Sequence, residues 1–155
     1  MMKLYLIQHA ESKSKEEDPE RGLTDLGFEN VKKVARFIKK FNISVETIYH
    51  SDKLRAKQTA NELALSINAT SGLKQREGIA PMDDITSMND EISKGDKNLM
   101  IVGHLPYMAK LTSALLCENE NQNVVSFQNG CIVKLVRDEE NKGWSVKWMI
   151  TPDIC

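Results

Sequence analysis

The sequence predicts an α/β fold in which helices sandwich a mixed sheet, and three observations lead to this prediction. The runs Leu4–Ile7 and Leu99–Val102 are wholly apolar, as strands buried on both faces are. Segments with a helical spacing of apolar residues separate the strand-like segments, which is the order typical of α/β proteins. Residues 132–137 and 144–150 alternate apolar and polar side chains around a polar loop, which predicts a terminal β-hairpin.

The first helix is expected after a charged loop at residues 13–20. Thr24 is a good N-cap, and Asp25 suits the first turn of a helix. Apolar residues then recur at steps of three and four, which gives the helix one buried face. The members of this face are Val31, Val34, Ala35, Ile38 and Phe41.

The residue pattern in the middle of the chain predicts two more strands with a helix between them. Residues 45–50 form the second strand of the prediction, and residues 69–74 form a short third strand. Ser51 and Asp52 start the intervening helix, which we expect to run to about Ile67.

Two further helices are expected before the hairpin. Asp83 and Asp84 open a modest helix that Gly95 ends. Pro106 fits the first turn of the next helix, which follows the apolar strand at residues 99–102. The polar residues 118–130 are typical of a loop.

Length and charge exclude several classes of partner. A chain of 155 residues fits one domain over residues 1–155. The net charge is −1, and no basic stripe interleaves with aromatic residues, which argues against nucleic acid. No apolar segment approaches the ~18 residues of a membrane span, and Gln8 and His9 interrupt the N-terminal run, unlike a signal peptide. We therefore expect neither nucleic acid nor membrane as a partner.

The cysteines and histidines do not form a metal-binding pattern. Cys117, Cys131 and Cys155 are odd in number and widely spaced, which fits neither a disulfide framework nor a CxxC site. Scattered histidines without neighbouring cysteines also argue against structural zinc. We expect reduced thiols in a cytoplasmic protein, with no metal and no other cofactor.

Side chains that could take part in a reaction lie at the ends of three predicted strands. His9 and His104 each follow an apolar run, and a third strand ends at His50 with Arg55 soon after it. The carboxyl ends of parallel strands meet at one edge of a sheet, where α/β proteins bind ligands. An imidazole can act as nucleophile, acid or base, and an arginine can bind phosphate oxygens through two parallel hydrogen bonds. This set suits phosphoryl transfer through a phosphohistidine.

These residues resemble the histidine phosphatase, or phosphoglycerate mutase-like, superfamily. Its first motif, Arg-His-Gly at a strand end, corresponds to Gln8-His9-Ala10, and its second motif corresponds to residues 51–60. Gly103-His104 matches a later Gly-His element, and the segment from Arg21 to Gly27 is most similar to SixA-type phosphohistidine phosphatases. The resemblance covers nearly the whole chain. It implies a three-layer α/β/α sandwich with a mostly parallel central sheet, and a cofactor-independent phosphatase.

The resemblance also assigns roles to individual residues. His9 is expected to be the nucleophile, Arg55 a phosphate clamp, and His104 a hydrogen-bond donor to the phosphoryl oxygens. Arg21 lies where the SixA-type enzymes have an arginine near the pocket, although a surface arginine in a charged loop stays an alternative. The substrate-binding residues expected on this resemblance are Gln8, Arg21 and Ser51.

The sequence departs from the family pattern at three positions. Gln8 replaces an arginine, which removes a charge-assisted bond at a cost of about 1–2 kcal/mol, or roughly ten- to thirtyfold. Ala10 replaces glycine, and its β-carbon crowds the site unless φ is negative. Gly22 replaces proline, which we expect to loosen the loop that carries Arg21.

No motif identifies a general acid among Glu77, Asp83 and Asp84. A phosphohistidine substrate leaves as imidazole, which needs little or no protonation, so this gap favours a phosphohistidine protein and a role in signal transduction. Two alternatives stay open. One is a phosphomonoesterase for a small phosphorylated substrate with Glu77 or Asp83 as acid, and the other is a phosphate- or phosphoprotein-binding module whose catalysis is weakened by Gln8.

Overall fold

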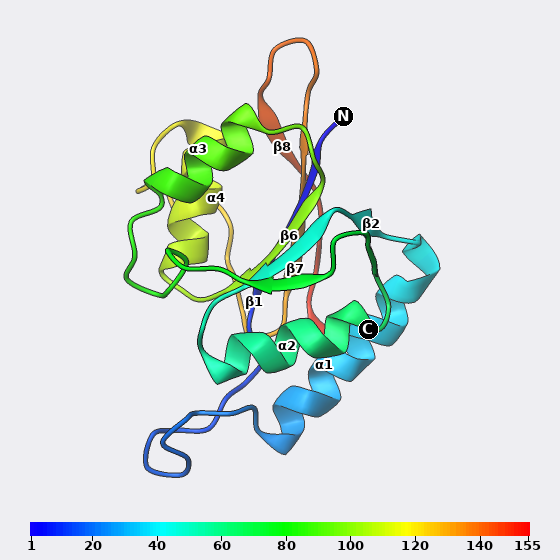
Figure 1. Ribbon diagram of the computed structural model, residues 1–155, viewed down its shortest axis with the longest axis vertical. Coiled ribbons are helices and arrows are strands. Elements are labelled where there is room, and N and C mark those ends of the chain that lie inside the picture. Colours follow the sequence, from blue (N-terminus) through cyan, green and yellow to red (C-terminus); the bar gives the residue numbers. More distant parts are fainter.

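A six-stranded sheet of order β5-β3-β6-β1-β7-β8 forms the middle layer of the computed structural model, which describes residues 1–155 (Figure 1). The strands from β5 to β1 are parallel to their neighbours, and β7 runs antiparallel to both β1 and β8. The mostly parallel sheet with a terminal hairpin is therefore confirmed. The strands of this sheet are β1 (Lys3–Gln8), β3 (Thr47–His50), β5 (Leu73–Gln75), β6 (Leu99–Gly103), β7 (Ile132–Arg137) and β8 (Trp144–Ile150).

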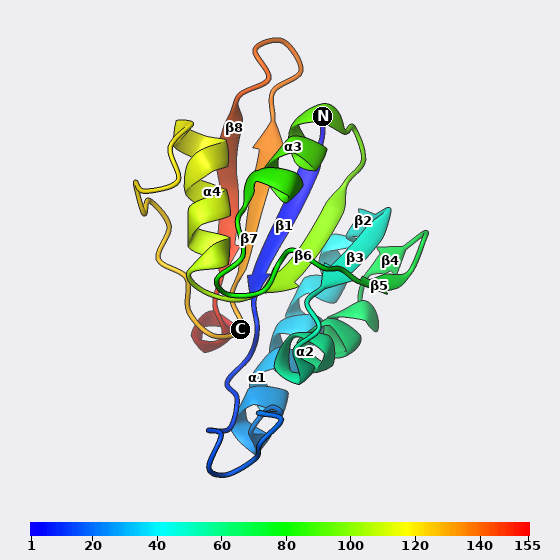
Figure 2. The same ribbon diagram turned by 60° about the vertical axis from the view of Figure 1, so that its left-hand side comes forward.

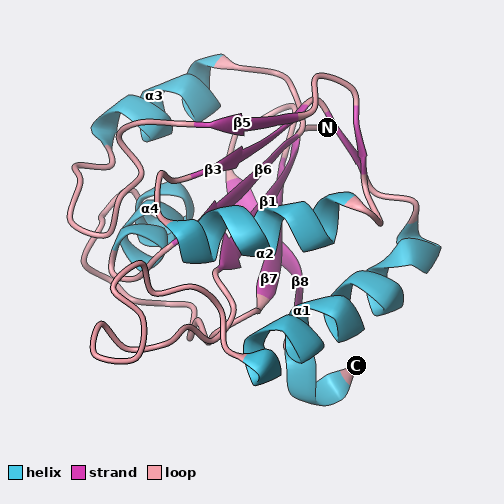
Figure 3. Cartoon of the chain, turned by 60° about the horizontal axis from the view of Figure 1, so that its bottom comes forward, coloured by secondary structure: helices cyan, strands magenta, loops and turns pink.

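Helices cover both faces of the sheet, as Figures 2 and 3 show. The first pair, α1 (Asp25–Ile38) and α2 (Leu54–Ala64), packs on one face. The second pair, α3 (Thr86–Lys94) and α4 (Tyr107–Cys117), packs on the other. The three-layer α/β/α sandwich is thereby confirmed. No helix is both long enough and apolar enough to span a membrane.

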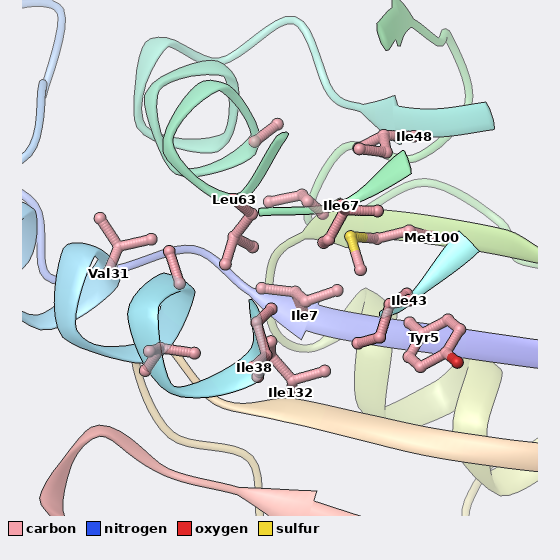
Figure 4. Close-up of a cluster of buried hydrophobic side chains, with 14 of the residues drawn as sticks. Tyr5, Ile7, Val31, Ile38, Ile43, Ile48, Leu63, Ile67, Met100 and Ile132 are labelled. Carbon is pink, nitrogen blue, oxygen red and sulfur yellow. The ribbon is translucent and has the colours of Figure 1, made fainter. Parts of the chain in front are cut away.

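Strand β1 contributes to both cores because its side chains alternate between the two faces. Tyr5 and Ile7 join the cluster under α1 and α2, in which Figure 4 shows Ile7 close to Ile38. Leu4 and Leu6 join the cluster under α3 and α4. Because β1 is buried on both faces, the side chains on both of its faces must be apolar, as the sequence indicated.

Two predicted strands are each interrupted, and this corrects their boundaries. Residues 45–50 divide into β2 (Ser44–Val45) and β3, and residues 69–74 divide into β4 (Asn68–Ala69) and β5. The short strands β2 and β4 pair in a separate two-stranded sheet. Glu46 lies at the break, where its N–H donates to Asn98 and its carbonyl accepts from Ser71. These long-range bonds separate the pairing of β2 with β4 from the pairing of β3 with its neighbours.

Helix ends also differ from the prediction. Helix α2 ends at Ala64 rather than near Ile67, because the next three N–H groups bond carbonyls only three residues back. Phe41 lies in a 3₁₀ turn, η1 (Lys39–Phe41), and is 43% exposed, so it is not part of the buried face of α1. Helix α3 begins after the predicted Asp83-Asp84 start, at Thr86. Pro106 lies just before α4, and a second 3₁₀ turn, η2 (Pro152–Ile154), follows β8.

The pairing of the parallel strands brings three strand ends together. Gln8 pairs with Gly103, and His50 pairs with Val102 across the neighbouring strands. The residues that follow these pairs therefore share one edge of the sheet. The loop before β7 joins them, since the N–H of Gly130 donates to the carbonyls of both Gln8 and His9.

Candidate active site

The two strand-end histidines, His9 after β1 and His104 after β6, face each other. Their ring centroids are 5.1 Å apart and the ring planes are inclined by 53°. The backbone N–H of His9 donates to the carbonyl of Gly103 at 3.0 Å, which extends the sheet pairing by one residue. The predicted meeting of these histidines follows from this pairing.

His9 is held in one tautomer by its own backbone neighbour. Its Nδ1 lies 2.7 Å from the carbonyl oxygen of Ala10. Because a carbonyl oxygen only accepts, Nδ1 carries the proton and Nε2 keeps its lone pair. Burial, with smaller effects from the positive charges of Arg55 and Arg21, lowers the pKa of His9 to about 4. The ring is therefore neutral at pH 7 and can act as a nucleophile.

His104 is held in the same tautomer as His9, but by the side chain of Ser51. Its Nε2 lies 2.6 Å from Oγ of Ser51, and the same oxygen accepts the N–H of Lys53 at 3.3 Å. We infer that the Ser51 hydroxyl donates to Nε2, which leaves the ring proton on Nδ1. That nitrogen is buried and has no partner. Burial, followed by the nearby His9 and Arg55, lowers the pKa of His104 to about 3, so this ring is also neutral.

Arg55, at the second position of α2, is only 8% exposed and forms no salt bridge. Its Nε is buried without a hydrogen-bond partner. Burial and the charge of Arg21 lower the pKa of Arg55, and Asp52 opposes this, but a guanidinium stays charged in proteins. An unpaired buried charge is unfavourable, so this position favours an anionic ligand.

Thr59 fixes Arg55 and β1 relative to each other. Its hydroxyl donates to the carbonyl of Arg55 at 2.8 Å and accepts the N–H of Ala10 at 3.0 Å. Ala10 is fully buried and is not among the residues with positive φ, so its β-carbon is accommodated. Gln58 accepts the N–H of Leu23 at 2.7 Å. The contacts of Thr59 with Ala10 and of Gln58 with Leu23 join α2 to distant segments, so no local sequence pattern indicates them.

The loop that carries Arg21 is tied by Asp18. Arg21 has φ +53°, and its N–H donates to the carbonyl of Asp18 at 2.9 Å. The N–H of Gly22 donates to Oδ2 of the same residue at 2.9 Å. The Nε of Arg21 donates to the carbonyl of Lys13 at 3.2 Å. Gly22 therefore supplies an N–H bond that a proline could not make, and this bond opposes the loosening expected at this position.

Gln8 is bound by a residue that the sequence did not single out. Its Nε2 donates to Oδ1 of Asn129 at 2.9 Å, while its Oε1 is buried without a partner. No local pattern marks Asn129, which lies in the polar loop before β7. The side chain of Gln8 therefore stands at the site edge in a bond to that loop.

The remaining titratable candidates form no hydrogen bond or salt bridge with either histidine. Glu77, Asp83 and Asp84 are exposed, and a hydrogen bond from Thr86 lowers the pKa of Asp84. His50 is buried, and its Nδ1 lies 2.9 Å from the carbonyl of Ser51, which holds that loop in place. No group of three histidine, cysteine or acidic side chains is arranged to bind a metal ion.

Comparisons with known proteins agree with this geometry. A structure of the protein histidine phosphatase SixA complexed with tungstate superimposes with a TM-score of 0.84 over 99% of both chains at 21% identity. A phosphoserine phosphatase of Entamoeba histolytica superimposes with a TM-score of 0.69 over 97% of this chain and 98% of the other, at 18% identity. These two similarities establish the fold.

Sequence similarity identifies the family to which the chain belongs. Phosphohistidine phosphatase SixA of Escherichia coli (strain K12) is 24% identical over 97% of this chain and 94% of its own length. The model of the histidine phosphatase superfamily (branch 1) matches residues 4–83, which is more than half of the chain and includes His9 and Arg55. The chain therefore belongs to branch 1 of the histidine phosphatase superfamily and is a phosphatase.

Proposed function

We propose that residues 1–155 form one phosphatase domain, which removes a phosphoryl group from a protein histidine in cytoplasmic signal transduction. One observation carries this proposal. Nε of Arg55 and Nδ1 of His104 are buried donors without partners, and they lie beside the neutral ring of His9. A phosphoryl group bound to His9 would satisfy both donors.

The first step is transfer of the phosphoryl group to His9. Nε2 of His9 attacks phosphorus while the phosphorus–nitrogen bond of the substrate breaks. The substrate ring, protonated on its other nitrogen, leaves with the electron pair as neutral imidazole. Arg55, Arg21 and Nδ1–H of His104 donate to the phosphoryl oxygens, where charge develops in the transition state. Because the ring of His9 keeps its Nδ1 proton, phosphorylated His9 is itself a good leaving group.

The second step is hydrolysis of this intermediate. Water attacks the phosphorus of phosphorylated His9, the phosphorus–Nε2 bond breaks, and the ring recovers its lone pair. The water proton passes to solvent or to the departing inorganic phosphate. No cofactor takes part in either step of this proposal.

The lack of a suitable general acid supports a phosphohistidine substrate. An alkoxide leaving group needs a proton donor, and Asp84 is a poor donor because its pKa is lowered. Glu77 and Asp83 are exposed, and neither forms a hydrogen bond with His9 or His104. An imidazole leaving group needs no such donor. The similarity to a protein named phosphohistidine phosphatase points the same way.

A small-molecule phosphomonoesterase is the second candidate, because the phosphoserine phosphatase shares this fold. Turnover of a phosphohistidine peptide, phosphoramidate and p-nitrophenyl phosphate under one set of conditions separates the two candidates. We expect the phosphohistidine peptide to be hydrolysed with the highest kcat/KM. A higher kcat/KM for p-nitrophenyl phosphate would favour the esterase, and binding without any turnover would favour a binding module.

The intermediate can be tested directly with a phosphorus-32-labelled substrate. Alkaline quenching during turnover should trap label on the protein, and acid quenching should not, because phosphohistidine is acid-labile. His9→Gln should abolish the trapped label, whereas His50→Gln should retain it, since His50 lies outside the proposed machinery. Label that survives in His9→Gln protein would contradict the proposal.

A further inference from the structure

A cavity of about 640 Å³ opens beside the two arginines of the site. Its lining has an excess of positive charge, with five cationic side chains against the carboxylates of Glu20 and Asp52. The whole chain, by contrast, has a net charge of −1. The cationic side chains are Lys15, Arg21, Lys53, Arg55 and Lys57. Positive charge is therefore concentrated here and not spread over the protein.

Contacts within the protein do not account for this concentration. Lys53 lies 3.8 Å from Oδ1 of Asp52, at the limit of an ion pair. Lys15 and Lys57 form no salt bridge, and the first turn of α2 contains no acidic residue. Like charges held together cost stability, and a basic cluster beside the N-terminus of a helix attracts anions.

The cavity has the wrong lining for a small organic ligand. Such ligands are usually held by hydrophobic and aromatic side chains, but Leu54 is the single hydrophobic residue here and no aromatic residue is present. The cavity is also larger than one phosphoryl group needs. Long, flexible lysines suit carboxylate side chains of a protein, which they can attract over a distance and bind in several arrangements.

We propose that this cavity binds acidic side chains that flank the phosphohistidine of a protein substrate, so that the enzyme selects acidic phosphoprotein segments. Lys53 and Lys57, one turn apart at the start of α2, form one wall, and Lys15 of the 13–20 loop forms another. Arg21 and Arg55 between them bind the phosphoryl group. This inference rests on the proposed function of the same site.

The test compares two phosphohistidine peptides that differ only in their flanking residues, glutamate in one and glutamine in the other. The test variant combines Lys15→Gln, Lys53→Gln and Lys57→Gln. A matched control combines Lys39→Gln, Lys94→Gln and Lys97→Gln, which removes the same charge from exposed positions outside the cavity. Thermal unfolding of all proteins shows that each variant is folded.

We expect the wild-type enzyme to prefer the acidic peptide in kcat/KM. The test variant should reduce this preference about tenfold, since each exposed charge pair contributes a modest amount, while the control variant should retain it. Added salt should weaken the preference of the wild-type enzyme more than that of the test variant. An equal loss for both peptides, or no loss for either, would overturn the inference.

A binding measurement separates this inference from the proposed function. The same two peptides are made with a non-hydrolysable phosphonotriazolyl analogue of phosphohistidine, and their affinities are measured by fluorescence anisotropy. Tighter binding of the acidic peptide that depends on the three lysines supports the inference even if neither phosphohistidine peptide is hydrolysed. Hydrolysis of both peptides without any difference in affinity supports the function and overturns the inference.

Discussion

The hydroxyl of Ser51 and Nε2 of His104, 2.6 Å apart, determine which nitrogen of that ring can face a phosphoryl oxygen. The expected substrate-binding role of Ser51 becomes, in this geometry, a positioning role through His104. Ser51→Ala should leave the ring free to change tautomer and should lower kcat about tenfold, the equivalent of ~1–2 kcal/mol. Ser113→Ala, which removes a buried hydroxyl far from the histidines, should alter stability but not kcat. Equal effects on kcat would refute this role.

Both histidines of the site should titrate well below ordinary imidazoles. The pKa of His9 is lowered to about 4 and that of His104 to about 3, mainly by burial. NMR titration of the free protein should therefore show neutral rings at pH 6, and Arg21→Gln should raise the midpoint of His9 because one positive charge is removed. In the unfolded chain these two histidines bind protons near pH 6.5, whereas in the folded protein they stay neutral to lower pH. The free energy of unfolding should therefore fall as the pH drops from about 6.5 towards 4. An NMR titration midpoint for His9 near 6.5 would contradict the lowered pKa.

Gln8→Arg should strengthen anion binding. An arginine at this position adds a charge-assisted bond, so phosphate or tungstate should bind about tenfold more tightly, as ~1–2 kcal/mol implies. The new side chain loses the bond of Gln8 to Asn129, and Asn129→Ala is the control for that loss. Calorimetry measures all the affinities. Arg55→Ala should weaken binding far more than Gln8→Ala, and equal losses would show that the pocket is arranged differently.

Asp18 should control the position of Arg21 without touching the substrate. Asp18→Ala removes the acceptor for Gly22, and the left-handed backbone of Arg21 then lacks one of its restraints. We expect KM to rise by more than kcat falls. Asp18→Asn, whose amide oxygen still accepts, should recover most of the loss. Glu16→Ala in the same loop is the control, and a rise in KM equal to that of Asp18→Ala would point to a general effect of charge.

The sequence predicts the strand ends well because their signals are local. The apolar runs before His9 and His104 identify buried strands, and parallel strands bring their ends together. Thr24 is confirmed as the N-cap of α1, since its hydroxyl accepts the N–H of Gly27. The layers and the hairpin follow from periodicity in the same way.

What the sequence could not predict depends on contacts between distant segments. The bond of Gln8 to Asn129 spans most of the chain, and nothing near either residue marks it. The break at Glu46 arises from backbone bonds to Asn98 and Ser71, which interrupt a segment that is locally a good strand. Asp18 and Gly22 are close in sequence, but their contact needs a turn that no pattern of side chains predicts.

The place of β1 between β6 and β7 has a consequence for the synthesis of the protein. Leu4 pairs with Leu99 on one side and with Leu135 on the other, so both partners of this strand leave the ribosome long after it. A nascent chain that ends at Cys117 already carries His9, Arg55 and His104, yet it lacks β7 and the Gly130 amide that donates to the carboxyl end of β1. During that interval the apolar run Leu4–Ile7 has an unpaired edge that chaperones can bind. Assembly of the active site is therefore a late event of folding, and the enzyme becomes able to act only when nearly its whole chain has been made.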